Sequence, residues 1–352
     1  MRQDSRQFFL SLLDAAGPSG DERAAARVWR DYASGFASVE TDALGSSHAT
    51  VNSAGERTVV VMGHIDEIGL AITHVDDEGY LWFDGVGGWT PSVLVGQRIR
   101  ILAKEGPIIG VIGKKATHLL DEEDRKKPIK LDQLWIDIGA NDGDDARALV
   151  RPGDLAVIEQ PVVELANGRL ASRAMDNRTG AFVAAEAARL YADTPGSWRF
   201  VGVASVAEEI SFAGAHTSSF ALAPQAAIAI DVTHTADYPS VTKNKIGDIK
   251  IGGGPVIERG SGVHTAFAEL VAEVAAAEGI PHQFGAAAGH TWTDADAVHR
   301  SRGGIPTCLV SVPNRYMHSP NEMVSLVDVD NAATLIAEFC RSITAETDLT
   351  AR

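Results

Sequence analysis

Four runs of consecutive apolar, largely β-branched residues predict buried strands. Between them, apolar side chains recur at helical spacing, as in the N-terminal segment, where Phe8, Phe9, Leu12 and Leu13 form one stripe. Runs buried on both faces are typical of a parallel sheet that is covered by helices on each side. The predicted strands are Thr58–Met62, Phe200–Val206, Ala226–Ile230 and Thr307–Val312, and the predicted helices are Ala181–Tyr191, Ala266–Ala277 and Val329–Thr344. The pattern therefore indicates an α/β domain with a mainly parallel sheet.

The middle of the chain has a different pattern, from about Gly69 to Leu165. Short strand-like pieces, punctuated by Gly and Pro, follow one another there without a long helix: Leu81–Phe83, Arg98–Leu102, Ile108–Ile112, Leu134–Ile138 and Leu155–Ile158. This segment is predicted to form a small β-barrel or sandwich inserted in the α/β domain. Residues 1–68 and 166–352 then make up the α/β domain, and residues 69–165 the insertion. The charged stretch Lys114–Lys130 is expected to be a solvated loop.

The balance of charges excludes several classes of partner. Asp and Glu number 47 and Lys and Arg 31 among 352 residues, which gives a net charge of −16 at pH 7. A chain this acidic repels nucleic acid and anionic membrane surfaces, so neither is expected as a partner.

No apolar run reaches the roughly 18 residues that a membrane span needs, and the N-terminus lacks the pattern of a signal peptide. Since only Cys308 and Cys340 could pair, a reducing cytoplasm is the expected location.

Polar side chains with metal-binding chemistry follow each of the four predicted buried strands. The carboxyl ends of parallel strands meet at one edge of a sheet, and ligands bind there, so these groups can converge from distant parts of the sequence. Singly, each has a simpler explanation, such as a helix N-terminal charge or a turn residue, but four similar strand ends argue against coincidence. The candidate residues after these strands are His64, Asp66, Glu208, Glu209, Asp231 and His318, and a further carboxylate, Asp176, lies just before the helix expected to open at about Thr179.

Imidazole and carboxylate groups without a thiolate favour zinc, cobalt or manganese as the bound metal. Two histidines and three carboxylates are too many for one tetrahedral ion. They suit two ions about 3.5–4 Å apart that share a bridging carboxylate. One of the adjacent residues Glu208 and Glu209 is then left over. Neighbours on an extended strand end point to opposite sides, so one of the two can bind metal while the other acts as a general base.

Other catalytic signatures are absent from the sequence. No GxSxG nucleophile elbow and no GxxxxGK[ST] phosphate-binding loop occurs. The glycine-rich stretch IGGGPVIERGSG lacks the strand and helix order of a dinucleotide site, and is expected to be a loop. His290 and Asp294, in GHTWTDADAVH, are further candidates for lining a pocket.

A set of motifs spread over nearly the whole chain resembles a known enzyme family. The motifs are GPSGDE, GHIDEIG, ATHLL, LWIDIGA, RPGD, MDNR, AEE, DVT and NRYMHSP. The chain resembles the dinuclear-zinc aminopeptidases of peptidase family M-42, which include glutamyl, deblocking and TET aminopeptidases and members labelled endoglucanases. The resemblance implies a zinc-aminopeptidase-like three-layer domain with a mixed, mainly parallel sheet. It also implies that the inserted small β-barrel is a dimerisation domain.

Carried over by motif, the resemblance implies that five of the candidate side chains bind two divalent metal ions, zinc being preferred over cobalt or manganese. Asp176 would bridge the ions. His64 and Asp231 would complete one ion's shell, and Glu209 and His318 the other's.

The resemblance also implies two catalytic roles. Glu208 would be the general base, and Asp66 would accept a hydrogen bond from the other ring nitrogen of His64 and so fix its tautomer. One departure from the family pattern is Asn177, where many members carry a second aspartate. The bridging position beside it is intact, so metal binding is still expected.

The implied activity is that of a metallo-aminopeptidase. It would remove N-terminal residues from short peptides with a hydroxide held by two metal ions and Glu208 as base. The resemblance further implies a homo-oligomer, in which dimers assemble into a dodecamer. One alternative is another co-catalytic zinc hydrolase of the same fold, such as a dipeptidase, carboxypeptidase or deacylase. The other is a catalytically inactive assembly or binding protein, which the complete ligand-and-base set disfavours.

Overall fold

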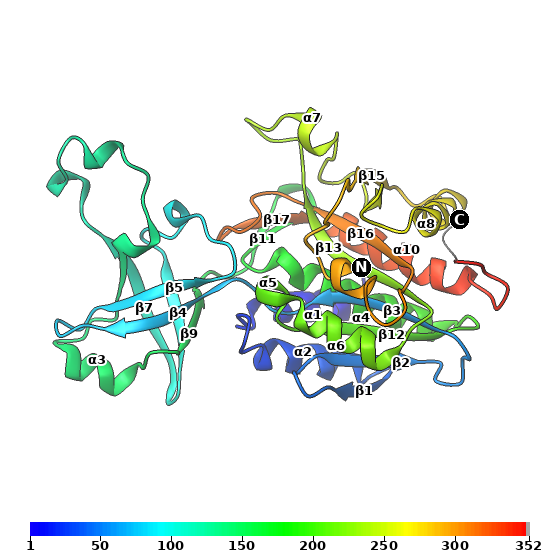
Figure 1. Cartoon of the computed structure of the whole chain (residues 1–352), viewed down its shortest axis with the longest axis horizontal. Coiled ribbons are helices and arrows are strands. Elements are labelled where there is room, and N and C mark those ends of the chain that lie inside the picture. The colour runs from blue at the N-terminus through cyan, green and yellow to red at the C-terminus, as the bar shows by residue number, and fades with distance from the viewer. Residues whose placement is uncertain (350–352) are drawn as a thin grey trace.

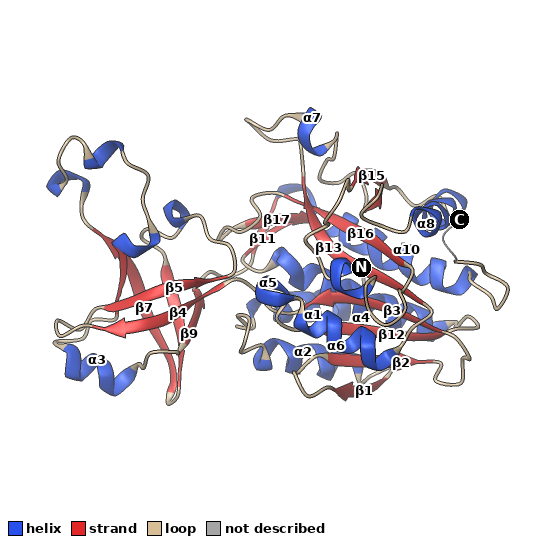
Figure 2. Cartoon of the chain, in the orientation of Figure 1, coloured by secondary structure: helices blue, strands red, loops and turns tan. Residues whose placement is uncertain are grey.

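An eight-stranded mixed sheet runs through the α/β body of the computed structural model, which describes residues 1–349 (Figures 1 and 2). Four neighbouring strands at its centre, in the order β12-β3-β13-β16, are parallel, whereas β2 and β14 join them antiparallel. The mainly parallel sheet is thus confirmed at its centre. In sheet order the strands are β1 (Ser38–Thr41), β2 (Ser47–Val51), β12 (Arg199–Ser205), β3 (Thr58–His64), β13 (Ala226–His234), β16 (Thr307–Asn314), β14 (Val256–Arg259) and β15 (Gln283–Ala286).

Helices cover both faces of this sheet, as the apolar strands predict. Val59 and Val61 of β3 point into the larger core, and Val60 and Met62 into a smaller core on the other face. The larger core is formed with α1 (Gln3–Asp14), α2 (Arg23–Ala33), α4 (Met175–Asp193), α8 (Thr265–Ala277) and α10 (Leu326–Ser342). On the opposite face lie α6 (Ala213–Leu222) and α9 (Ala295–Val298), and two further short helices are α5 (Glu208–Ser211) and α7 (Lys243–Ile246).

The inserted segment forms a closed β-barrel, drawn on the left of Figure 1 beside the α/β body. All six strand pairs are antiparallel, in the order β4-β5-β8-β7-β6-β9. The strands are β4 (Gly69–Val75), β5 (Leu81–Val86), β6 (Arg98–Ala103), β7 (Gly106–Lys114), β8 (Leu134–Asp137) and β9 (Leu155–Ile158), with α3 (Gly143–Leu149) before the last. The barrel has a hydrophobic core of its own. Residues 115–128 are mostly exposed and form only short 3-10 turns, as expected of a solvated loop.

A small antiparallel sheet follows the barrel along the chain. It consists of β10 (Val163–Leu165), β11 (Arg169–Ser172) and β17 (Glu322–Ser325), with β11 in the middle. The sheet therefore places the segment just before Asp176 next to the segment just after His318. The division of the chain at residues 69 and 165 remains a prediction.

Both cysteines, Cys308 and Cys340, are free and buried in the α/β body. Across residues 1–349, none of the helices is both long enough and apolar enough to cross a membrane.

Candidate metal centre

The predicted side chains gather at the carboxyl edge of the four central parallel strands. His64 is the last residue of β3, Asp231 lies within β13, and Glu208 and Glu209 follow β12 after two residues. His318 lies in the loop after β16, and Asp176 lies at the start of α4. Because these strands are neighbours in one parallel sheet, side chains more than 100 residues apart reach the same place.

Close packing of α4 on β3 brings Asp176 to His64. A Cβ atom at Gly63 would clash with the backbone of Gly180, and one at Gly180 would clash with the backbone oxygen of Ile230 in β13, so both positions need glycine for the helix to lie this near the sheet. Asp176 itself is not helical, with φ −81° and ψ 107°, and it precedes the regular part of the helix as the sequence suggests.

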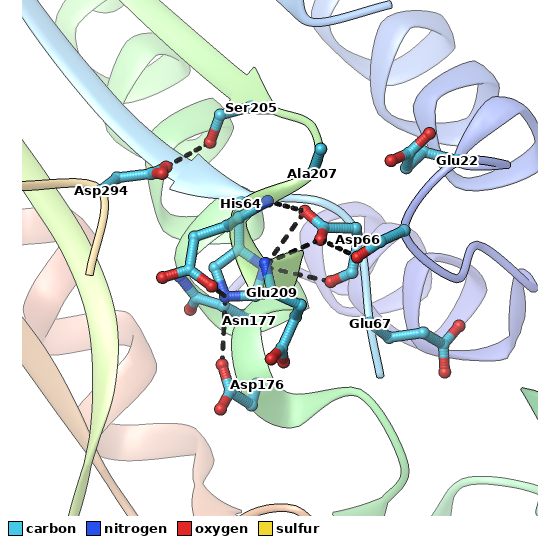
Figure 3. Close-up of polar contacts among 12 residues, drawn as sticks. Glu22, His64, Asp66, Glu67, Asp176, Asn177, Ser205, Ala207, Glu209 and Asp294 are labelled. Atoms are coloured by element: carbon cyan, nitrogen blue, oxygen red, sulfur yellow. Dashed lines mark hydrogen bonds and ion pairs between the residues drawn. The ribbon is translucent and has the colours of Figure 1, made fainter. Parts of the chain in front are cut away.

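Asp176 lies between two imidazoles. Its Oδ1 is 3.2 Å from Nε2 of His64, and its Oδ2 is 3.4 Å from Nε2 of His318 (Figure 3 shows the first contact). Oε1 of Glu209 lies 3.6 Å from the same nitrogen of His318. This arrangement offers one carboxylate oxygen of Asp176 to each of two neighbouring positions.

Two groups of side chains in this cluster have ligand atoms within 4.8 Å of one another: His64 with Asp176 and Glu209, and His64 with Glu208 and Asp231. Oε1 of Glu209 is buried and lacks a hydrogen-bond partner, which is unusual for a carboxylate oxygen unless it binds an ion. Imidazole and carboxylate donors at this spacing fit a divalent cation. The second group also shows that Glu208 lies within ligand distance.

The carboxyl groups repel one another in the absence of cations. Burial raises the pKa of Glu208 to about 11 and that of Glu209 to about 8. Burial also raises the pKa of Asp231 well above its usual range. Burial alone would raise the pKa of Asp176 as well, but hydrogen bonds from His318 and His64 outweigh it and lower that pKa. Divalent cations would supply the positive charge that keeps such a cluster ionised.

Asp66 contacts both His64 and the turn that carries the two glutamates, and its role in fixing the tautomer of His64 remains a prediction. Nδ1 of His64 lies 3.1 Å from the backbone oxygen of Asp66 and 3.5 Å from its Oδ1. The Asp66 carboxylate accepts hydrogen bonds from the backbone N–H groups of Glu208, at 3.1 Å, and Glu209, at 3.2 Å, and from the Ser19 hydroxyl. One residue therefore fixes both the histidine and the turn that carries the two glutamates.

That turn is helical, which corrects the expectation of an extended strand end. Glu208 and Glu209 begin the short helix α5, so their side chains diverge by about 100° around a helix axis rather than by 180°. Ala207, which immediately precedes them, has a φ of 57°, in the left-handed region.

A buried ion cluster anchors the GPSGDE segment beside the site. Glu67 is 2% exposed and forms ion pairs with Arg173 and Arg178. Its Oε1 also accepts a hydrogen bond from the backbone N–H of Gly17, at 3.0 Å. Since Gly17 is two residues from Ser19, this cluster holds in place the hydroxyl that donates to Asp66.

Glu322 is a supporting residue that the sequence analysis missed. Its Oε2 accepts a hydrogen bond from the backbone N–H of Asp176, at 2.8 Å, and its Oε1 accepts one from that of His318, at 2.7 Å. The side chain therefore ties together two segments that carry candidate ligands. The only signal in the sequence is its place four residues after His318, in HSPNE.

His290 and Asp294 do not share one pocket. His290 lines a separate cavity. Asp294 is buried and accepts a hydrogen bond from the Ser205 hydroxyl (Figure 3). Ser205 pairs with His64 across the β12–β3 ladder, so Asp294 contacts the strand ends rather than the pocket.

Comparison with known proteins agrees with this geometry. Residues 45–335 match the M42 glutamyl aminopeptidase family. A lysyl aminopeptidase from Pyrococcus furiosus is 33% identical over 336 residues, which are 94% of this chain and 94% of the relative. The crystal structure of a TET aminopeptidase from a marine sediment Thaumarchaeota archaeon has a TM-score of 0.93 and 32% identity, and the match covers 97% of each chain.

A second solved structure is the TET1 peptidase of Pyrococcus horikoshii, described as able to assemble into a tetrahedron or a large octahedral shell. Its TM-score is 0.86 at 31% identity, and the match covers 96% of this chain and all of that one. The length of these matches and the shared fold show that this chain belongs to the M42 glutamyl aminopeptidase family and is a peptide hydrolase.

Proposed function

We propose that this chain is an aminopeptidase that removes N-terminal residues from short peptides and binds two divalent ions, zinc being preferred and cobalt or manganese the alternatives. The position of Asp176 between His64 and His318, at 3.2 and 3.4 Å, is the observation that carries this proposal. A carboxylate so placed has one oxygen for each ion. We assign Asp231 to the ion of His64, and Glu209 to the ion of His318.

Divalent ions held by these residues would supply Lewis acidity, which would polarise the carbonyl of the scissile bond and lower the pKa of a water molecule. Glu208 accepts the proton of the attacking water and returns it to the nitrogen of the departing amine, so that one carboxyl group serves both transfers. The Asp66 carboxylate keeps Glu208 in place through the hydrogen bond from its backbone N–H. Glu322 holds the segments of Asp176 and His318 at a fixed separation.

A panel of substrates with each end blocked in turn tests the proposal. The chelated protein, reloaded with zinc, cobalt or manganese, should cleave aminoacyl p-nitroanilides and peptides with an amidated C-terminus. It should not cleave the same peptides after N-acetylation. Cleavage that needs a free C-terminus, or that tolerates the acetyl group, would point instead to a carboxypeptidase, dipeptidase or deacylase.

We further propose that the barrel segment, residues 69–165, is a dimerisation domain and that dimers assemble into a dodecamer in the cytoplasm. The similarity to the TET1 peptidase of Pyrococcus horikoshii, described as able to assemble into a tetrahedron or a large octahedral shell, supports the proposed oligomer. The barrel leaves the α/β body five residues after His64 and its chain returns shortly before Asp176, so it can wall the site and contact another subunit. Light scattering of the metal-loaded protein should give the mass of about twelve subunits. A fully active monomer would contradict both parts.

A further inference from the structure

The candidate metal centre opens into a pocket of about 430 Å³ with two chemically different sides. One side carries the proposed ligands and general base. The rest of the lining contains the large apolar side chains of Phe212, Val232, Trp292 and Met317, together with Gly88, His234 and three threonines, Thr233, Thr291 and Thr293. A cavity of this size, at the lower end of the range for small-molecule sites, holds about one amino-acid residue next to the reacting groups.

The pocket has no charge to pair with a charged side chain of the substrate. Among residues 1–349, no Lys or Arg lines it, and its four acidic residues are the proposed ligands and base. Apart from the proposed ligand His318, the remaining titratable group is His234, whose pKa burial lowers, which favours its neutral imidazole. A buried charge without a partner is strongly unfavourable.

Trp292 is held at the edge of this pocket although its side chain is 76% exposed. Its φ is 57°, a conformation that bulky residues rarely adopt and that needs support from the surroundings. The support comes from Asp296, which accepts hydrogen bonds from the backbone N–H of Trp292, at 3.1 Å, and from that of Thr291, at 3.0 Å. The indole is therefore a preformed apolar surface that faces solvent at the edge of the pocket.

We infer that this pocket receives the side chain of the substrate's first residue and selects neutral, apolar residues such as Leu, Met and Phe, with Trp292 as a specificity-determining residue. The inference rests on the proposed aminopeptidase function and names its substrate class. A leucine or phenylalanine side chain removes the indole and Phe212 from water, which is favourable in proportion to the apolar area covered. Glutamate or lysine would bury a charge opposite neutral side chains.

Steady-state kinetics with aminoacyl p-nitroanilides test the preference. For the metal-loaded protein, kcat/KM for the Leu, Met and Phe substrates should exceed that for the Glu and Lys substrates by at least ~100-fold. A highest value for Glu or Lys would overturn the inference and leave the aminopeptidase function intact. Failure to cleave any of these substrates with any of the metals would overturn both.

Substitution of Trp292 tests its own role. Trp292→Ala should lower kcat/KM for Leu and Phe substrates at least ~10-fold and that for the Ala substrate less than ~2-fold. Trp292→Glu should raise the ratio of Lys to Leu cleavage at least ~10-fold, since it supplies the missing counter-charge. Equal losses on all substrates, or an unchanged Lys to Leu ratio, would overturn the assignment.

Two controls separate this role from a structural one. Phe220→Ala removes another exposed aromatic side chain, on α6 and outside the pocket, and should leave the selectivity unchanged. Trp292→Phe keeps an apolar ring and should restore the preference for Leu and Phe substrates. A changed selectivity in Phe220→Ala, or no restoration by Trp292→Phe, would count against the inference.

Discussion

Replacing Glu208 by Gln separates the role of a general base from that of a metal ligand. The side chain is 7% exposed, and its Oε2 lies 3.5 Å from Nε2 of His64. Glutamine has the same size and can still accept hydrogen bonds, but it cannot take a proton from water. If Glu208 is the base, the variant should bind metal as the parent protein does and should lose turnover.

The expected loss follows from the proton-transfer role. General acid–base catalysis contributes about 10²–10⁴-fold, so kcat should fall by that factor, which corresponds to about 2.7–5.4 kcal/mol in the activation barrier. Burial raises the pKa of Glu208 to about 11 in the metal-free protein, and a carboxyl group that stays protonated cannot act as a base. Activity at neutral pH therefore requires that bound cations bring this pKa down.

The matched variant is Glu209→Gln, which changes the neighbouring residue in the same helical turn. Metal content by plasma mass spectrometry, together with kcat on an aminoacyl p-nitroanilide, should show two ions and little activity in Glu208→Gln. In Glu209→Gln the metal content should show the loss of one ion. Because Glu208 also lies within ligand distance of the His64 and Asp231 side chains, the metal content of the two variants discriminates between base and ligand. Loss of an ion from Glu208→Gln, or near-normal turnover, would refute the assignment.

Three further predictions concern the metals and the surrounding ion pairs. Asp176→Ala should release both ions and His64→Ala fewer, since only a bridging carboxylate neutralises two cations at once; metal analysis that finds one ion lost from each would contradict the bridge. Glu67→Ala removes the carboxylate that forms ion pairs with two buried arginines, at a cost of about 3–5 kcal/mol. For a 352-residue chain this cost lowers the thermal midpoint by about 4–7 °C, and an unchanged midpoint by calorimetry would show that the ion cluster is not stabilising. In the chelated protein the pKa values of Glu209 and His318 are raised to about 8 and about 9, so folding takes up protons. The thermal midpoint should therefore decrease as the pH is raised from about 5 to about 8. A thermal midpoint that increases over this pH range would contradict the raised pKa values.

The sequence by itself determines the layers of this protein and the neighbourhood of its site. Each central strand is buried on both faces, so its residues form an unbroken apolar run that can be recognised without coordinates. The parallel arrangement follows from the alternation of such runs with helices, and it brings His64 and Asp231 to one edge of the sheet. The spacing of apolar residues in a strand or helix, and the burial that it indicates, can be recognised from residues that are close together in the sequence.

Only the tertiary structure decides the contacts between segments that are distant in sequence. The helical turn at Glu208, the two hydrogen bonds accepted by Glu322 and the place of Trp292 depend on loops, where no periodic pattern exists. Three residues beside the site, Ala207, Trp292 and His318, have left-handed backbone conformations that the surrounding hydrogen bonds and packing stabilise against their intrinsic preference. A propensity read from the sequence cannot anticipate a conformation that depends on specific hydrogen bonds in the folded loop, such as those that Asp296 accepts from Trp292 and Glu322 accepts from His318.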